Sequence, residues 1–409
     1  MRVAFLTQDL QLSGGVGVLL EHAAQLAGLG FEVDLVLTRT SERPDWAHRA
    51  LQGATVRGID DARGRRYDVA VSTWWETTQR LFELDAARYA CFVQSLEDRF
   101  YPPGDPRRLA ASLSLDVPAR FITEARWIAD TLAELRPAEQ VLYVRNGIAK
   151  HVFGPVPAAP PPHEGPLRIL VEGNAGVPFK GVADALVAVG AMAEPRHVTL
   201  VAPDAGAGAD AADRDLGPIP QSALAELYGA SDVLLKLSRV EGMFGPPLEG
   251  FHRGATCVVT PVTGHDEYVV HGENGLVTDW DDPLGTARAL DRLARDGALL
   301  HRLRWGALAT ARAWPSWEQQ GQVMAAALEA IRRERPPAGQ GGGLRLARDI
   351  AAALSDGERA AAELAVARRR AAQVEGSRAY QLAVRGRTTV ERAVRAPGRW
   401  RRRRRGEIL

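Results

Sequence analysis

Residues 238–279 read SRVEGMFGPPLEGFHRGATCVVTPVTGHDEYVVHGENGLVTD and contain the strongest pattern in the chain. The apolar run just upstream, residues 233–237, is typical of a buried parallel strand. The turn FGPP follows, and because proline is tolerated at the first positions of a helix, we expect a helix over residues 248–253. A second apolar strand is predicted at residues 257–259. The stretch therefore predicts strand, turn, helix and strand, the repeating unit of an α/β domain.

Two glutamates bracket this turn, Glu241 before it and Glu249 within the predicted helix. Free backbone N–H groups at the start of a helix favour an anion such as a phosphate. The two carboxylates would then lie where they can accept hydrogen bonds from sugar hydroxyls on either side. The alternative is that Glu241 caps the turn and Glu249 is a solvated acid of the first helical turn. Spacing alone leaves both interpretations open.

The same residues resemble a motif of the family-4 retaining glycosyltransferases, which have the two-domain GT-B fold. Seven residues separate Glu241 from Glu249, as in the Glu-x7-Glu motif of that family. Gly264, Glu267 and the run GENGLV at residues 272–277 resemble the elements that follow that motif. The resemblance implies that Glu249 holds the ribose of a nucleotide sugar and that Glu241 faces the donor sugar.

The composition is that of a globular chain with room for two or three domains, since 46% of its 409 residues are hydrophobic and 25% are charged. Cys91 and Cys257 each fall in a predicted strand, which favours buried thiols over a disulfide. The sequence has neither a signal-peptide pattern at its start nor an apolar run long enough to span a membrane. We therefore expect a cytoplasmic protein, with peripheral attachment to the inner face of the plasma membrane as an open alternative.

Residues 1–150 predict an α/β domain on the acceptor side. A strand at residues 3–6 leads through Gly14 and Gly15 into an amphipathic helix. A glycine-rich turn between strand and helix can admit phosphates to the backbone, although this turn lacks the dinucleotide-binding fingerprint. It lies where the family has Ser-Gly-Gly-Val, and the resemblance implies that Gly14 and Gly15 let the donor phosphates or the acceptor approach.

The loop FVQSLEDRFYP at residues 92–102 leaves another predicted strand, at the edge where open α/β sheets bind ligands. It resembles a loop of a family-4 subgroup that includes bacterial rhamnosyltransferases for surface polysaccharides, with Ser95 in place of the usual acid. Gln94 and Glu97 are therefore candidate contacts to the transferred sugar or the acceptor. The alternative role for both residues is to pin the loop through side-chain hydrogen bonds.

A Pro-rich linker at residues 151–166 separates this domain from a second Rossmann-like domain at residues 167–315. A helix over residues 316–335 is expected to cross back to the first domain. Parallel sheets facing one another across a cleft are the architecture that the GT-B resemblance implies.

The second domain contains the glycine turn GNAGVPFKG at residues 173–181. The resemblance places Lys180 of this turn on the donor diphosphate. Asn174 stands where the family usually has arginine, so either Arg239 or backbone N–H groups would have to compensate. The candidate donor site is completed by residues of the central turn: Met243, Phe244, Gly245, Pro247 and Leu248.

By resemblance, the chain is predicted to be a glycosyltransferase whose catalytic residues are Glu241 and Lys180. It would move a hexose or deoxyhexose from a nucleotide sugar to a glycan or lipid-linked acceptor, with retention of the anomeric configuration. No metal or other cofactor is expected, because no cluster of potential ligands has metal-type spacing. Two alternatives stay open: a nucleotide-sugar epimerase on a related fold, and a non-catalytic partner subunit.

Residues 336–409 form a Gly/Pro linker and a basic tail, in which seventeen arginines outnumber seven acidic residues from position 344 onward. Helices are predicted at residues 351–374 and 377–394. The tail is either a solvated, partly disordered segment or an anchor to an anionic membrane surface, where each basic residue adds roughly 1 kcal/mol. Nucleic-acid binding is not expected, because no recognisable binding module accompanies the charge.

Overall fold

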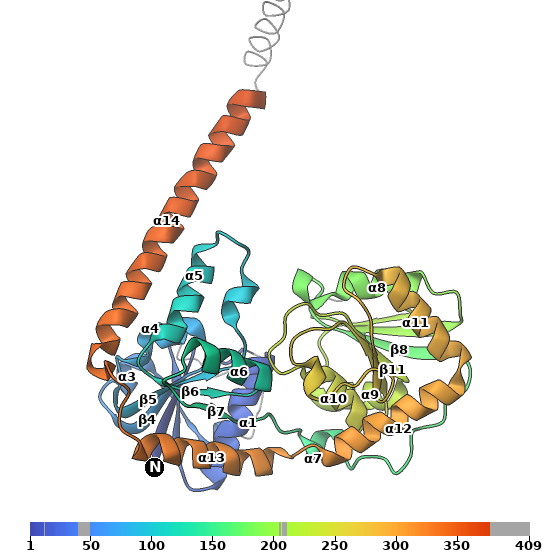
Figure 1. Cartoon of the computed structure of the whole chain (residues 1–409), viewed down its shortest axis with the longest axis horizontal. Coiled ribbons are helices and arrows are strands. Elements are labelled where there is room, and N and C mark those ends of the chain that lie inside the picture. The colour runs from blue at the N-terminus through green and yellow to red at the C-terminus, as the bar shows by residue number, and fades with distance from the viewer. Residues whose placement is uncertain (12, 40–49, 204–205, 207–210, 377–409) are drawn as a thin grey trace, which may run out of the picture. The chain divides into compact units, whose positions relative to one another are not determined.

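Two parallel sheets organise the computed structural model, which describes residues 1–11, 13–39, 50–203, 206 and 211–376 (Figure 1). The first sheet has the order β3-β2-β1-β4-β5-β6-β7 and the second β10-β9-β8-β11-β12-β13. Every pair of neighbouring strands is parallel. This arrangement confirms the prediction of two Rossmann-like domains. The predicted helix at residues 377–394 and the charge run beyond it lie outside the described residues.

The first sheet is apolar because helices cover both of its faces. Its strands are β1 (Arg2–Thr7), β2 (Glu32–Leu37), β3 (Thr55–Gly58), β4 (Arg66–Ser72), β5 (Asp85–Val93), β6 (Arg120–Thr123) and β7 (Val141–Tyr143). The helices around it are α1 (Gly14–Gly28), α2 (Ala50–Gly53), α3 (Ile59–Ala62), α4 (Trp75–Leu81), α5 (Pro106–Leu113) and α6 (Arg126–Leu135). Ser13 begins α1, since its hydroxyl accepts a hydrogen bond from the Val16 N–H.

The second sheet repeats this arrangement with shorter strands. They are β8 (Leu167–Glu172), β9 (Arg196–Val201), β10 (Arg214–Leu216), β11 (Val233–Lys236), β12 (Thr256–Val259) and β13 (Gly275–Val277). The helices are α7 (Lys150–Phe153), α8 (Val182–Gly190), α9 (Gln221–Ala230), α10 (Gly245–His252), α11 (Pro283–Arg295) and α12 (Gly297–Ala313). The edge strand β10 was not predicted, because its three residues, Arg-Asp-Leu, have no apolar pattern.

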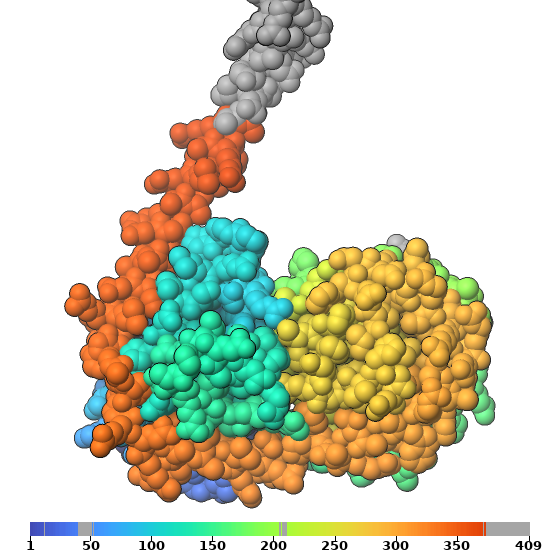
Figure 2. Space-filling model, in the orientation of Figure 1, coloured from blue at the N-terminus to red at the C-terminus, as the bar shows by residue number. Residues whose placement is uncertain are grey.

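Helix α13 (Trp317–Arg333) packs against α1 of the first domain. It begins at Trp317 because Ser316 and Gln319 form a capping box directly after Pro315. A Cβ at Gly321 would overlap the Gln25 side chain of α1, so the two helices approach closely at this glycine. Figure 2 shows the orange surface of α13 lying along the N-terminal domain.

The chain divides into two compact units, Met1–Ala351 and Ala352–Leu409, and both sheets belong to the first. The helix predicted from residue 351 in fact begins eight residues earlier, because α14 spans Gly343–Gly376. The Gly/Pro segment before this helix therefore comprises residues 336–342. Residues 344–350, which read LRLARDI, contain leucine, arginine and alanine, and these residues favour helix and extend α14 back to Gly343.

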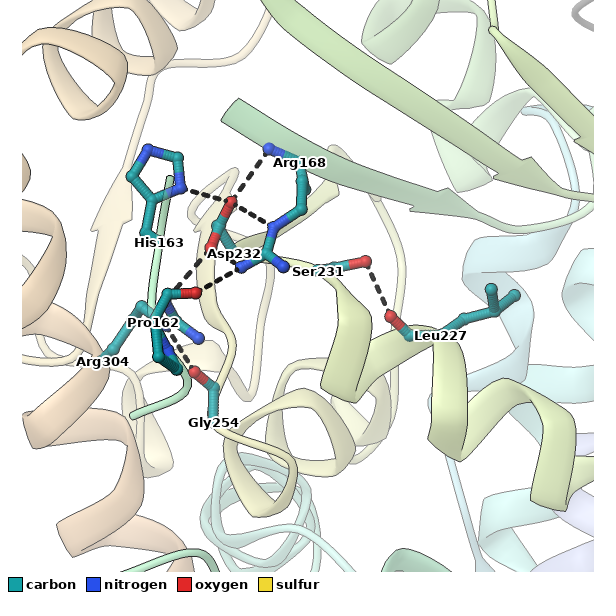
Figure 3. A network of polar contacts seen from close by, with 8 residues as sticks. All are labelled: Pro162, His163, Arg168, Leu227, Ser231, Asp232, Gly254 and Arg304. Carbon is teal, nitrogen blue, oxygen red and sulfur yellow. Dashed lines mark hydrogen bonds and ion pairs between the residues drawn. The ribbon is translucent and has the colours of Figure 1, made fainter. Parts of the chain in front are cut away.

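A buried carboxylate, Asp232, joins four segments of the second domain at the edge opposite the carboxyl ends of the strands (Figure 3). It precedes β11 and accepts hydrogen bonds from Arg168 of β8 through Nη2 at 2.6 Å and Nε at 2.9 Å. Arg304 of α12 donates from Nη1 at 3.1 Å, and His163 of the linker lies at 2.9 Å. Burial alone would raise the pKa of Asp232, but the hydrogen bonds from Arg168 hold it below its usual value.

We expect Asp232→Ala to lower the free energy of unfolding by about 3–5 kcal/mol, because it leaves the buried guanidinium of Arg304 without a counter-charge. Urea unfolding followed by circular dichroism measures the change. The control is Glu329→Ala, which removes exposed ion pairs to Arg332 and Arg333 and should change stability by less than about 1 kcal/mol. Equal losses in both variants would contradict a structural role for Asp232.

The imidazole of His22 is buried in the first domain between the rings of Phe92 and Trp317. Burial lowers its pKa to about 4. The unfolded chain therefore takes up a proton at His22 as the pH falls below about 6.5, whereas the folded chain does so only near pH 4. Folding consequently loses stability as the solution is acidified through this interval.

The His22→Leu variant should lose less stability than the wild type between pH 7 and pH 4.5. The shift at His22 corresponds to about 3 kcal/mol once the pH has fallen below both pKa values. Melting temperatures recorded across this interval test the expectation. Parallel curves for the two proteins would show that His22 is not the group responsible.

Candidate functional site

The strand order of the second sheet reverses between β8 and β11, the place where open α/β sheets bind ligands. The last residues of these strands, Glu172 and Lys236, form an ion pair in which Nζ lies 2.6 Å from Oε1. Lys236 also donates to the Glu172 carbonyl oxygen at 3.2 Å, and it is only 4% exposed. Neither residue was predicted from the sequence, although a lysine at the end of the apolar strand Val-Leu-Leu-Lys is itself a signal.

The two predicted catalytic residues also meet at this edge. The Nζ atom of Lys180 lies 3.0 Å from each carboxylate oxygen of Glu241. Lys180 comes from the turn after β8, and Glu241 from the turn after β11. Glu241 is 9% exposed, whereas the Lys180 side chain keeps 31% of its surface open to solvent. The ammonium is thus held by one carboxylate and still accessible to an anion.

Gly181 fixes the position of the Lys180 turn. Its φ of +67° favours glycine, and a Cβ there would overlap the carbonyl oxygen of Leu237. The Arg239 N–H donates to the Phe179 carbonyl at 2.8 Å and holds the same two segments together. Contact between the turns after β8 and β11 therefore requires a residue without a side chain at position 181.

Replacing Gly181 by alanine should lower the free energy of unfolding by more than about 2 kcal/mol, since left-handed backbone strain alone costs about 1–3 kcal/mol and the overlap adds to it. Gly190→Ala is the matched control at the other end of α8, where an added Cβ meets nothing within 4 Å. Denaturant unfolding of both variants tests the difference. A Gly181→Ala protein as stable as the control would rule out the close approach.

Glu249 projects from α10 toward the same cluster and is part-buried. Burial raises its pKa to about 8, the Glu172 carboxylate adds to this effect, and Tyr228 and Lys236 oppose it. Burial alone would lower the pKa of Lys236, but the carboxylates of Glu172, Glu241 and Glu249 together raise it. Glu172 is the carboxylate in direct contact with the buried ammonium of Lys236.

The start of α10 has open space at Gly245, where a Cβ would meet nothing within 4 Å. Pro246 and Pro247 have no N–H, so Gly245 supplies the one N–H among the first three residues of the helix. The predicted turn residues Phe244, Pro247 and Leu248 are buried, and Met243 is part-buried. Their role in this structure is to hold the turn, since the Phe244 carbonyl accepts a hydrogen bond from the buried hydroxyl of Tyr268.

Two of the predicted donor contacts are engaged elsewhere. The Asn174 side chain is exposed, and its Oδ1 accepts a hydrogen bond from the Gly176 N–H at 2.9 Å. Arg239 binds Asp184 at 3.0 Å and Asp281 at 2.5 Å. In this arrangement neither side chain faces the Lys180–Glu241 pair, so backbone N–H groups are the better candidates to compensate for the missing arginine.

In the first domain, Gln94 links the glycine turn to the Glu241 turn. Its Nε2 donates to the Gly15 carbonyl at 3.3 Å, and a Cβ at Gly15 would lie 2.7 Å from its Oε1. A Cβ at Gly242 would overlap the Gln94 carbonyl oxygen, so the two domains touch at this glycine. Gly14 has open space around it.

Glu97 has the contacts of a residue that pins the loop. Its Oε2 accepts a hydrogen bond from the Trp75 N–H at 2.6 Å, at the start of α4. Burial raises its pKa well above the usual value. This geometry favours the structural alternative for Glu97, whereas Gln94 lies where the segments of the candidate site converge.

Glu267 and Asn274, which also belong to the pattern that resembles the family, form hydrogen bonds that hold loops in place. Glu267 accepts hydrogen bonds from the Arg126 N–H at the start of α6 and from the Tyr143 hydroxyl at 3.0 Å, so it joins the two domains. Asn274 accepts from the Val270 N–H and donates to the Tyr268 carbonyl, both at 2.7 Å. These two side chains shape the loops around the site without facing the Lys180–Glu241 pair.

Among the residues that the structure describes, no group of three or more His, Cys, Asp or Glu side chains is placed to hold a metal ion. None of the helices in this part of the chain combines the length and the apolar character needed to cross a bilayer.

The family model and the curated relative that match this chain are both described as glycosyltransferases. Residues 174–296 match the family described as "Glycosyl transferases group 1". The chain is 25% identical over 401 residues to a D-inositol 3-phosphate glycosyltransferase of Thermobispora bispora, covering 79% of this chain and 92% of the relative. The description of this relative does not name a rhamnosyltransferase, so that finer resemblance stays a prediction.

Two solved structures share the fold. Sucrose-phosphate synthase from Thermosynechococcus elongatus superposes with a TM-score of 0.66 at 18% identity, over 81% of this chain and 98% of the other. Anabaena HepE in complex with UDP-glucose superposes with a TM-score of 0.65 at 16% identity, over 81% of this chain and 100% of the other. These matches confirm the predicted GT-B fold.

Proposed function

We propose that the chain is a glycosyltransferase of the group 1 class, which moves a hexose or deoxyhexose from a nucleotide sugar to a hydroxyl of a glycan or lipid-linked acceptor. The observation that carries this proposal is the Lys180–Glu241 ion pair beside the start of α10, the helix that contains Glu249. A cation, the Gly245 N–H and carboxylates from neighbouring segments match the diphosphate and the hydroxyls of a nucleotide sugar.

In the proposed complex the donor diphosphate lies between Lys180 and the start of α10. An ammonium has three N–H groups, and Glu241 engages two of them in this structure, so one remains for a phosphate oxygen. Negative charge that develops on the leaving diphosphate is stabilised by this ammonium and by the Gly245 N–H at the start of α10. Glu249 accepts hydrogen bonds from the ribose, and Glu241 faces the transferred sugar.

The acceptor in this proposal enters from the first domain, next to Gly15 and Gln94. Gln94 binds the Gly15 carbonyl and lies against Gly242 in the turn that contains Glu241, so an acceptor hydroxyl bound there is within reach of the donor sugar. Closure of the two domains around both substrates excludes water and favours transfer over hydrolysis. Retention of the anomeric configuration remains part of the proposal on the resemblance alone.

The proposal extends to the donor and to the biological role. The complex of HepE with UDP-glucose makes UDP-sugars the first donors to test. The resemblance of residues 92–102 to surface-polysaccharide enzymes supports a role in polysaccharide or glycoconjugate synthesis. A cytoplasmic enzyme working at the inner membrane face would meet a lipid-linked acceptor there, and the basic tail would favour that location.

Nucleotide release from a panel of UDP-, GDP- and dTDP-sugars tests the proposal with candidate acceptors present. Wild-type protein should consume one donor. At pH 9, where Glu249 is ionised, Glu249→Gln should lower kcat/KM for that donor by about 10- to 100-fold, as expected when hydrogen bonds to a charged group are lost. Glu226→Gln is the matched control, since Glu226 is an exposed acid of α9. The control should retain full activity.

Three outcomes would contradict the proposal. Binding of no nucleotide sugar would show that the cluster is not a donor site. Conversion of a donor into another sugar nucleotide without an acceptor would identify an epimerase. A Glu249→Gln protein as active as the control would remove the ribose contact from the mechanism.

A further inference from the structure

One peptide bond of the Glu241 turn, the bond between Gly242 and Met243, has both of its polar groups bound by the first domain. The Gly242 carbonyl oxygen accepts a hydrogen bond from the indole N–H of Trp127 at 2.9 Å. The Met243 N–H donates to Oε1 of Glu124 at 3.3 Å. Glu124 directly follows β6 and Trp127 lies in the first turn of α6. One short segment of the first domain therefore holds this 242–243 peptide bond by its carbonyl and by its N–H.

The 242–243 peptide bond lies in a space that leaves no room for side chains. A Cβ at Gly242 would overlap the Gln94 carbonyl oxygen and would lie 3.3 Å from the Glu124 Oε1. A Cβ at Gly264 would lie 2.6 Å from the Gly242 carbonyl oxygen and 3.2 Å from the Trp127 Nε1. The φ of Gly264 is +86°, a backbone conformation that favours glycine. Two glycines thus allow the first domain to reach hydrogen-bonding distance of this peptide bond.

The carbonyl of Glu241 itself is also connected to the first domain. It accepts a hydrogen bond from the Thr263 hydroxyl at 3.5 Å, and that hydroxyl accepts one from Nη1 of Arg99 at 3.0 Å. The Glu241 carboxylate meanwhile accepts two hydrogen bonds from the Lys180 ammonium, each 3.0 Å long. Contacts from the first domain therefore reach the main chain of the turn, while the Glu241 side chain is paired within the second domain.

Glu124 is a buried acid, since only 5% of its surface is exposed. Burying a carboxyl group is costly, and hydrogen bonds such as the one from the Met243 N–H have to offset that cost. Burial raises the pKa of Glu124 to about 8 and the Glu267 charge adds to the rise, whereas hydrogen bonding with Asn146 and Met243 opposes it. At pH 7 the carboxyl group is therefore mostly neutral, and its oxygen still accepts a hydrogen bond.

We propose that Glu124 and Trp127 are positioning residues, which fix the turn from the first domain so that the Glu241 carboxylate faces the transferred sugar only while the two domains are in contact. This inference rests on the proposed function, because it concerns the carboxylate that is placed next to the donor sugar there. In that proposal the donor is bound by groups of the second domain. Loss of the hold on the 242–243 peptide bond should therefore slow sugar transfer and leave donor affinity almost unchanged.

Substitutions of the two residues separate hydrogen bonding from packing. Glu124→Leu removes the acceptor for the Met243 N–H, and Trp127→Phe removes the indole donor but keeps an aromatic ring. Each should lower kcat at pH 7 by at least about tenfold, because misplacing a catalytic group by about 1 Å can cost roughly 100-fold. Glu124→Gln should keep nearly the wild-type kcat, since its amide oxygen accepts the same hydrogen bond and its neutral amide matches the neutral carboxyl group.

The measurements use the full-length chain and the UDP-, GDP- or dTDP-sugar that the wild type consumes. Nucleotide release at saturating donor and acceptor gives kcat, and calorimetric titration gives the dissociation constant of the donor. The double variant Glu124→Leu/Trp127→Phe should be little slower than the slower of the two single variants. Both substitutions release the same peptide bond, so their effects should not add.

Tyr143→Phe is the matched control. It removes the hydrogen bond from the Tyr143 hydroxyl to Glu267, another contact between the domains, without changing a residue that binds the 242–243 peptide bond. Its kcat should equal that of the wild type. Melting temperatures show which variants are folded. If Glu124→Leu does not fold, the comparison of Trp127→Phe with Glu124→Gln and with the control decides the matter.

Four results would overturn the inference while the proposed function stands. They are a wild-type kcat in folded Glu124→Leu or in Trp127→Phe, a Glu124→Gln protein as slow as the other variants, a control as slow as they are, and a donor affinity that falls in step with kcat. The last result would assign both residues to donor binding. If the wild type binds and consumes no nucleotide sugar, the proposed function itself is wrong, and this inference with it.

Discussion

The parallel pairing of β8 with β11 is the constraint on which the site depends. Val171 lies opposite Leu235 in this pair, so the next residues of the two strands, Glu172 and Lys236, emerge side by side at the carboxyl edge. Both turns that follow begin at this point, one with Gly173 and Lys180 and the other with Glu241. A slip of the strand register by one residue would turn these side chains to opposite faces of the sheet. The hydrophobic pattern that sets this register therefore also determines that Glu172 and Lys236 lie side by side.

The same two strands have an ion pair at each end, and the pairs have opposite polarity. At the start, Arg168 of β8 meets Asp232 just before β11. At the end, Glu172 of β8 meets Lys236 of β11. The first pair is completed by Arg304 and ties α12 to the sheet. The second lies at the carboxyl edge, where the turns that contain Lys180 and Glu241 begin, so one end of the strand pair ties the domain together and the other adjoins the candidate site.

Close backbone approach is the second constraint, and glycine meets it at two places. Gly181 brings the Lys180 turn onto the Leu237 carbonyl, within the second domain. Gly242 brings the Glu241 turn onto the Gln94 carbonyl of the first domain. Glu267 adds a contact between the domains by capping the start of α6. Residues of both domains thus meet around one short turn, which suits a reaction between a donor and a second substrate.

Local patterns in the chain establish the class of fold and most of the residues that meet at one sheet edge. Apolar runs separated by glycine turns predict two doubly wound domains, because buried parallel strands and the helices that cover them have distinct periodicities. The spacing of Glu241 and Glu249 around a Gly/Pro turn, with Lys180 upstream, indicates the site that the fold brings together. The edge strand β10 and the early start of α14 escape such prediction, because three residues without an apolar pattern and a glycine-rich run give weak local signals.

The way in which the charges of the site combine depends instead on tertiary contacts. Asn174 and Arg239 lie close to the site in sequence, yet they are engaged by other partners, and Lys236 ends a core strand yet is paired with Glu172 of another strand. Burial and the distances between residues far apart in the chain set these interactions, and neither quantity is encoded in a local pattern.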